Sequence, residues 1–367
     1  MPRLRRVRKG LSYRRHLGQG GRFRESRALH RLWKVHLRMP SRGHSTVPRD
    51  PSPRGPAEAR ARTQKRKADP ARPDRASGRP KKTMNTYLDC IPCFFKQALF
   101  AARAATKDEA KAKEVLDRVA QLVPSITLES SPPETARLIY HAVREVTGIA
   151  DPLKAYKERS IENALSMYGN LKSIVDNSRD PLRAAIKMAI VGNVIDLGAN
   201  PDFDLEWEMR TAFREKDLSE EHYESFKHRL EKTRNVLYLA DNAGETVFDR
   251  ILIETMGREA VYAVRDIPII NDATMEDARK SGIDKVARIV SSGCDAPGTI
   301  LKRCSREFLS LFASADLIVS KGQGNFESLS GEDAPVFFLL KVKCPVIARH
   351  LGVEIGSSIL KDARKQN

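Results

Sequence analysis

The stretch Asn235-Val-Leu-Tyr-Leu-Ala-Asp-Asn-Ala-Gly-Glu-Thr-Val-Phe-Asp-Arg250 decides the fold class of this chain. Its apolar run, Val236 to Ala240, is short, continuous and rich in strand formers, which is typical of a strand buried on both faces of a parallel sheet. From Thr246 onward the apolar residues have helical spacing. The polar residues between the two segments therefore lie at the carboxyl edge of a sheet, where ligands bind in open α/β proteins.

Further short apolar runs alternate with helical segments to the end of the chain. This alternation predicts right-handed crossovers and a doubly wound, mainly parallel sheet with helices on both faces. Residues 84–234 instead carry helix-start signals such as Asp-Pro and Pro-Pro pairs. The predicted class is α/β, with a helical N-terminal half (84–234) packed on a C-terminal α/β half (235–367). The remaining expected strands are 260–264, 286–290, 317–320, 336–340 and 345–348.

The basic character of the chain is confined to its first 83 residues. The formal net charge is +18, but residues 1–83 hold 26 lysines and arginines against 5 acidic residues, which leaves −3 for residues 84–367. The body is mildly acidic, so nucleic-acid binding is not expected of it, except through residues 1–83. No apolar run approaches the roughly 18 residues of a membrane span, so no membrane segment is expected.

Residues 1–83 are crowded with Arg, Pro, Gly and Ser and lack a periodic apolar face. Such a segment cannot bury enough apolar surface to offset the entropy of ordering it, so a disordered leader is expected. Three interpretations remain open. Met84 is the true start and the leader comes from a wrong start assignment; the leader is a basic tail that touches nucleic acid or anionic surfaces; or it is an Arg-rich organellar transit peptide.

Polar residues follow several of the expected strands. Asp241 and Asn242 offer hard oxygen ligands, which suit a divalent metal ion, and the next strand is followed by Asn271 and Asp272. The fourth strand leads into Lys321-Gly-Gln-Gly-Asn325, which resembles a phosphate cradle although it lacks P-loop spacing. A single strand-end Asp is often only a helix cap. Together, however, these loops predict a metal-bridged phosphate site.

Six segments of the body form an ordered set of motifs: Gly192–Asp196, Asp241–Glu245, Ile270–Asp272, Ser292–Gly298, Ser320–Asn325 and Lys343–Arg349. Taken together, they resemble family 89 of the domains of unknown function, the metal-dependent damage-control phosphatases. The likeness is strongest to the archaeal and bacterial branch with an N-terminal Cys-x-x-Cys, and it spans essentially all of 84–367.

The resemblance implies an activity and a set of site residues. It implies hydrolysis of phosphomonoesters of small, damaged or overflow metabolites, such as sugar phosphates or phosphorylated cofactors, with manganese, cobalt, nickel or magnesium. The implied metal ligands are Asp241, Asn242 and Asp272. The implied phosphate-binding residues are Lys321, Gly324, Asn325, Asn193, Asp196 and Asn271, although a buried polar network at a helix end explains Asn193 and Asp196 equally well.

Two chemical roles stay open at the first strand end. Asp241 is interpreted as a metal ligand, because Asn242 beside it cannot ionise and suits coordination, but a direct nucleophile is the alternative. Glu245 and Asp249, one turn apart on the following helix, are candidates for orienting water.

The chain has five cysteines, a number that is small and odd and therefore does not suit a disulfide framework. This favours a reducing compartment and a cytoplasmic protein. Cys90 and Cys93 precede a helix, where thiol pKa values fall. A structural zinc site needs four ligands, and Cys344, within a family-like segment, is a candidate third. Metal-linked packing, redox reactivity and a plain buried pair are the three interpretations. Cys294 and Cys304 are expected to be ordinary buried thiols.

Two other functions compete with the phosphatase. A strand ending in Asp and Gly also suits the ribose of a nucleotide or of S-adenosylmethionine, so a transferase is the alternative enzyme, although no Gly-x-Gly-x-x-Gly follows the first strand. An adaptor that binds nucleic acid through residues 1–83 is the alternative without catalysis.

Overall fold

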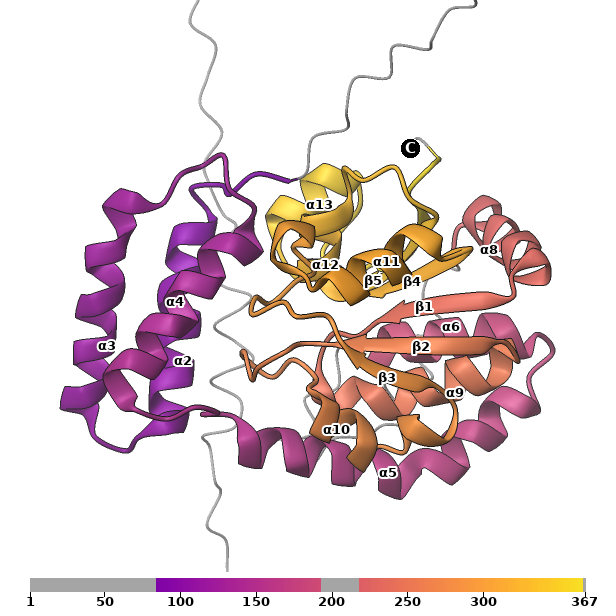
Figure 1. The fold of residues 1–367 in the computed structure, drawn as a ribbon, viewed down its shortest axis with the longest axis horizontal. Helices are drawn as coiled ribbons and strands as arrows, with labels where there is room; N and C mark the ends of the chain where they lie inside the picture. The colour runs from indigo at the N-terminus through magenta and orange to yellow at the C-terminus, as the bar shows by residue number, and fades with distance from the viewer. Residues whose placement is uncertain (1–83, 193–217, 366–367) are drawn as a thin grey trace, which may run out of the picture. The chain divides into compact units, whose positions relative to one another are not determined.

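The computed structural model describes residues 84–192 and 218–365, and there six strands form one sheet in the order β3-β2-β1-β4-β5-β6 (Figure 1). The strands β1 to β5 are parallel to their neighbours, and β6 runs antiparallel to β5. The predicted α/β class and the mainly parallel sheet are therefore confirmed. The bounds are β1 (Asn235–Leu239), β2 (Glu259–Val264), β3 (Arg288–Ser291), β4 (Leu317–Lys321), β5 (Val336–Lys341) and β6 (Ser358–Asp362).

The last predicted strand, 345–348, is wrong, because this segment begins helix α13 (Pro345–Leu351). Cys344 caps the helix by accepting from the Ile347 amide, the proline occupies the first turn, and Gly352 closes the helix with a φ of 66°. These helix signals outweigh the apolar character of the run. The sixth strand, β6, is a half-polar edge strand, and because it has no continuous apolar run the apolar pattern does not predict it.

Helices cover both faces of the sheet (Figure 1). Alternate residues of each central strand face opposite sides, so Tyr238 packs in one core and Leu239 in the other. The first core holds α5 (Lys154–Asp176), α6 (Pro181–Gly192), α8 (Glu220–Lys232), α9 (Thr246–Met256) and α10 (Met275–Lys280). The second holds α11 (Arg306–Ser314), α12 (Gly322–Leu329) and α13.

Three further helices form a core of their own: α2 (Cys90–Ala105), α3 (Glu109–Leu122) and α4 (Pro132–Thr147). The loop after β2 joins this core through Ile269, which is buried, and Ile270. The loop after β3 is tied to α4 by an ion pair between Arg137 Nε and Asp295 Oδ2, 2.6 Å apart. The α2–α4 core is thus fastened to the carboxyl edge of the sheet, whereas α5, α6 and α8 pack on its face.

Short 3₁₀ turns complete the fold: η1 (Val123–Ser125), η2 (Ala243–Glu245), η3 (Ile283–Lys285) and η4 (Leu301–Arg303). Across 84–192 and 218–365, no helix has the length and apolar character needed to cross a membrane. The leader, residues 1–83, lies outside the described residues.

Candidate metal and phosphate site

The segments that follow β1 and β2 are hydrogen-bonded to each other beyond the end of the sheet. Asn242 and Asp272 form an isolated antiparallel bridge, beside which the Ala243 amide donates to the Asn271 carbonyl at 2.8 Å. The backbone thereby holds Asp241, the residue before the bridge, next to Asp272. The two carboxylates expected to share a metal ion are brought together, as the strand order requires, because β1 and β2 are neighbours.

The pKa values of both carboxylates are raised. The Asp241 side chain keeps partial solvent exposure, yet burial raises its pKa to about 8, and the negative charges of Glu245 and Asp272 add to the rise. Burial also raises the pKa of Asp272, to about 6, against the opposing effect of Arg265. A cation at this edge would relieve the repulsion that Asp241 experiences.

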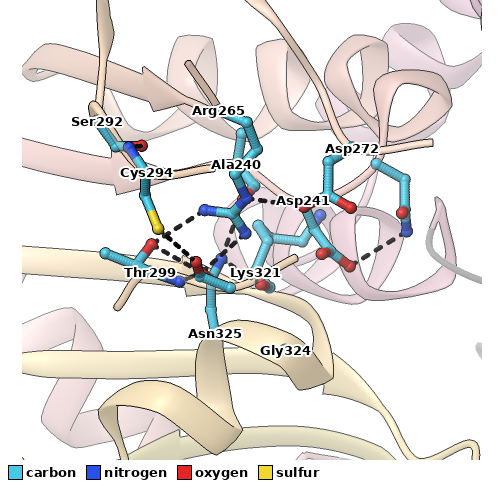
Figure 2. Close-up of polar contacts among 12 residues, drawn as sticks. Ala240, Asp241, Arg265, Asp272, Ser292, Cys294, Thr299, Lys321, Gly324 and Asn325 are labelled. Carbon is cyan, nitrogen blue, oxygen red and sulfur yellow. Dashed lines mark hydrogen bonds and ion pairs between the residues drawn. The ribbon is translucent and has the colours of Figure 1, made fainter. Parts of the chain in front are cut away.

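A buried arginine that the sequence analysis missed orients Asp272. Arg265, at the end of β2, donates from Nε to Asp272 Oδ2 at 2.7 Å and from Nη2 to Asn325 Oδ1 at 3.0 Å (Figure 2). Asn325 also accepts from Thr299 Oγ1 at 2.8 Å and donates to the Ala240 carbonyl at 3.0 Å. Asn325, predicted to bind phosphate, is fully buried and clamps three strand ends together.

Lys321, the predicted phosphate lysine, points into the protein. Its fully buried ammonium donates to Glu245 Oε2 at 2.7 Å and to Asp249 Oδ1 at 2.6 Å. Burial alone would lower the pKa of Lys321, but the charges of Asp249 and Glu245 outweigh this and raise it. Asp249 also accepts from the hydroxyls of Tyr238 and Tyr262, at 2.8 and 2.7 Å. The lysine and both helix carboxylates therefore form an internal ion network beneath the site.

This network is connected to the edge of the sheet through Asn242. Its Nδ2 donates to Asp241 Oδ2 at 3.1 Å and to Glu245 Oε1. Lys321 and Glu245 thus fix the orientation of the Asn242 side chain, which in turn holds Asp241.

Two glycines at the start of α12, directly after β4, allow close packing. Gly322 has a φ of +77°, and a Cβ there would lie 1.9 Å from Asp241 Oδ2. At Gly324 a Cβ would lie 1.9 Å from the Pro297 carbonyl oxygen. Gly322 therefore admits the Asp241 carboxylate to the start of α12, and Gly324, predicted to line a phosphate, brings the loop after β3 against α12.

The other predicted residues are placed in part. Asn193 and Asp196 lie outside the described residues. Asn271 contributes its carbonyl to the bridge and is half-buried. Its neighbour Ile270 has a φ of +46°, which is uncommon for a β-branched residue and marks a strained backbone at the site.

Two charged residues near Asp241 were not predicted. Lys343 is exposed, and its charge opposes the rise in the Asp241 pKa that burial causes. The Lys343 amide donates to Gln323 Oε1 at 2.6 Å, which holds it beside the first turn of α12. Burial raises the pKa of Glu327, on the same helix, to about 8, and Asp241 adds to the rise. Lys343 follows β5, so the end of a further strand was the signal that could have found it.

The oxygen atoms at the bridge suit a hard divalent ion. Among the described residues, no three Asp, Glu, His or Cys side chains surround a single point as metal ligands do. The two carboxylates would therefore need a further donor, and the amide oxygen of Asn242 is the nearest in sequence. That amide now turns its nitrogen to Asp241 and would have to rotate. The mutually repelling carboxylates and the adjacent amide fit a magnesium- or manganese-like ion.

Two surface hollows lie elsewhere. One is lined by Asn235, Glu259 and Arg288, which are the first residues of β1, β2 and β3. The other is lined by residues of α8 and α11, among them Arg229 and Phe312. Both lack the strand-end carboxylates, so we do not assign them to this site.

The sequence and the fold both have known relatives. Residues 86–359 match the damage-control phosphatase ARMT1-like domain. A protein of Pyrococcus horikoshii named as a damage-control phosphatase is 36% identical over 284 residues, which cover 75% of this chain and 97% of that protein. A damage-control phosphatase of Archaeoglobus fulgidus is 34% identical over 282 residues, 74% of this chain and 97% of the relative.

Similarity also extends to a protein without an assigned activity and to a crystal structure. An uncharacterized protein of Methanocaldococcus jannaschii is 33% identical over 286 residues, 74% of this chain and 93% of that protein. The crystal structure of a DUF89 family protein from Pyrococcus horikoshii superposes with a TM-score of 0.70 at 34% identity, covering 77% of this chain and all of that one.

Proposed function

The chain belongs to the damage-control phosphatase ARMT1-like domain family, and on that premise we propose that it is a metal-dependent phosphatase of small phosphorylated metabolites. The observation that carries the proposal is the backbone bridge between Asn242 and Asp272, beside which the Ala273 amide donates to the Asp241 carbonyl at 2.8 Å, so that Asp241 and Asp272 are neighbours at the carboxyl edge of the sheet. That edge is where open α/β folds bind their ligands.

We propose Asp241, Asp272 and the amide oxygen of Asn242 as the ligands of manganese, cobalt, nickel or magnesium. When bound, such an ion would polarise a phosphoryl oxygen and lower the pKa of a coordinated water. Arg265 keeps Asp272 in place through its 2.7 Å ion pair, and Lys321 holds Glu245 beside Asn242, whose amide would rotate to turn its oxygen to the ion.

The phosphate itself needs positive charge at the exposed side of the site. Lys343 is exposed and close enough to Asp241 to affect its acidity, whereas Lys321 is enclosed by two carboxylates. We therefore propose Lys343 as the lysine that contacts the phosphate, and a positioning role for Lys321. This revises the assignment made from the sequence.

The activity is tested with the full chain, freed of metal by a chelator and assayed on a panel of sugar phosphates and phosphorylated cofactors. Each substrate is tested with manganese, cobalt, nickel and magnesium in turn. We expect phosphate release that depends on one of these metals. Tight binding of a nucleotide or of S-adenosylmethionine without metal, and no phosphate release from any substrate, would support the alternative transferase instead.

A further inference from the structure

Two short segments beyond β3 lie side by side, and each carries one cysteine. At one end of this contact, a Cβ at Gly293 would lie only 2.7 Å from the backbone nitrogen of Ser305. At the other end, Arg303 Nε donates to Asp295 Oδ1 at 2.8 Å. The residue between these two contacts is a cysteine on both segments, so the fold holds the two cysteines opposite each other.

These residues, Cys294 and Cys304, share one small apolar cluster. Cys304 packs against the cluster that Cys294 forms with Ala296 and Ile300. Cys294 is fully buried, as expected, whereas Cys304 is partly exposed and gives a small oxidant access to the pair. A hydrogen bond from Cys304 lowers the pKa of the Cys294 thiol below its ordinary value. This favours the thiolate, which is the reactive form of cysteine.

We propose that Cys294 and Cys304 are a redox modification site, at which a peroxide closes an intramolecular disulfide. A disulfide joins cysteines whose Cα atoms are about 4.4–6.8 Å apart, a spacing that residues facing each other on adjoining segments have. A reactive thiol with a second thiol next to it is also the arrangement found in redox-sensing cysteine pairs.

The reaction needs only the peroxide and the two thiols. One thiolate attacks a peroxide oxygen and becomes a sulfenic acid, while hydroxide leaves. The second thiol then attacks that sulfur, the sulfur–sulfur bond forms, and water leaves. In sum, two thiols and one hydrogen peroxide give one disulfide and two water molecules, so the sulfurs are oxidised and the peroxide oxygens are reduced.

The disulfide would remove two hydrogen bonds around Thr299. In the reduced chain, Cys294 Sγ donates to the Gly298 carbonyl at 3.3 Å, and Figure 2 shows this thiol directed toward the part of the loop that carries Thr299. Cys304 Sγ donates to the Ile300 carbonyl, also at 3.3 Å. A disulfide has no thiol hydrogen, so both bonds are lost when it forms.

Thr299 connects this loop to the strand-end carboxylates. Its amide donates to Asn325 Oδ1 at 2.9 Å, and its hydroxyl accepts from Arg265 Nη1 at 3.1 Å. Arg265 in turn holds Asp272. Oxidation should therefore disturb the support of Asp272 and weaken metal binding. This consequence rests on the proposed metal site, whereas the disulfide itself does not.

Peptide mass tests the disulfide in the unchanged full chain. The chain is reduced, freed of reductant, treated with hydrogen peroxide, alkylated and digested with trypsin under non-reducing conditions. Trypsin cleaves after Lys302 and Arg303, so Cys294 and Cys304 fall on separate peptides, Ile289–Lys302 and Cys304–Arg306. We expect a species with the summed mass of both peptides less two hydrogens, which reduction separates again.

The absence of this linked species from the unchanged chain overturns the proposal, and so does a species that links Cys294 to another cysteine instead. The Cys304→Ser variant should give no linked species. The Cys90→Ser variant is the matched control, and it should still give the linked Ile289–Lys302 and Cys304–Arg306 peptides.

Manganese titration of the oxidised and reduced chains, after removal of peroxide and reductant, tests the coupling to the carboxylates. We expect weaker binding in the oxidised chain, recovery after reduction, and no difference between peroxide-treated and untreated Cys304→Ser. Equal affinity of the oxidised and reduced chains overturns the coupling. Manganese binding that is absent from both forms counts against the metal site, because the peptide masses alone decide the disulfide.

Discussion

Gly322 and Asp241 lie in direct contact, with the position of a Gly322 Cβ only 1.9 Å from Asp241 Oδ2. A Gly322→Ala chain must therefore displace the carboxylate, in addition to the cost of about 1–2 kcal/mol for an L-residue in the left-handed region. We expect loss of metal-dependent phosphate release, measured as kcat/KM.

Gly257→Ala is the matched control for this prediction. Gly257 also has a positive φ, +58°, but nothing lies within 4 Å of its Cβ position. In urea unfolding, the Gly257→Ala variant should lose about as much stability as the left-handed backbone at Gly322 costs an alanine. It should keep its phosphatase activity. Full activity in Gly322→Ala would show that the Asp241 carboxylate does not need its observed position.

The two lysines near the site should respond oppositely to the same substitution. Lys321→Met removes the cation from between Glu245 and Asp249, which are both fully enclosed, and should lower the free energy of unfolding by about 3–5 kcal/mol. Lys343→Met, at an exposed position, should change stability by less than about 0.5 kcal/mol. It should instead lower kcat/KM about 10-fold or more, because a charge-assisted hydrogen bond to phosphate is lost.

Urea unfolding and steady-state kinetics on both variants separate these roles. If Lys321→Met remains stable and only its phosphate affinity falls, then Lys321 contacts the substrate, as the sequence pattern predicted, and the internal network has no structural importance.

The sequence predicts which residues lie at the carboxyl edge of the sheet, but not which side chains are buried beneath that edge. The juxtaposition of Asp241 with Asp272 follows from two strand ends and the rule that neighbouring parallel strands share an edge. The orientation of a long side chain does not follow from such a rule. Lys321 occupies a strand end like the others, yet it points inward because Glu245 and Asp249 lie there, on the helix that follows β1.

Arg265 was overlooked for a related reason. Nothing in its local sequence distinguishes it from a surface arginine, and its partners Asp272 and Asn325 come from different strand ends. The short apolar run 345–348 predicts a strand, but Pro345 and Gly352 are the helix signals that decide the structure of α13. The branch with an N-terminal Cys-x-x-Cys, the compartment and the interpretations of residues 1–83 stay predictions.

The raised pKa of Asp241 predicts how metal-free stability depends on pH. Its pKa of about 8 in the folded chain lies above the ordinary carboxyl value of 3.8, so between these pH values the folded chain holds a proton that the unfolded chain has released. This carboxyl therefore lowers stability as pH rises through that window. Asp241→Asn removes the effect, so the variant should gain stability relative to the unchanged chain from pH 5 to pH 8.

Urea unfolding in the presence of a chelator at both pH values measures this difference. Added manganese should stabilise the unchanged chain more at pH 8 than at pH 5, because the metal binds the ionised carboxylates. A stability difference between variant and unchanged chain that does not change with pH would show that Asp241 is not held in a desolvated, negatively charged environment.

The most direct test of the central claim is a manganese titration, by calorimetry, of the chelator-treated full chain and three variants. Asp241→Asn and Asp272→Asn should each weaken manganese binding at the strand-end carboxylates by at least about 100-fold and abolish phosphate release. Asp284→Asn, at an exposed acidic residue of η3, should leave both unchanged. Manganese binding and phosphate release that survive in Asp272→Asn would contradict the claim that the two strand-end carboxylates share one ion.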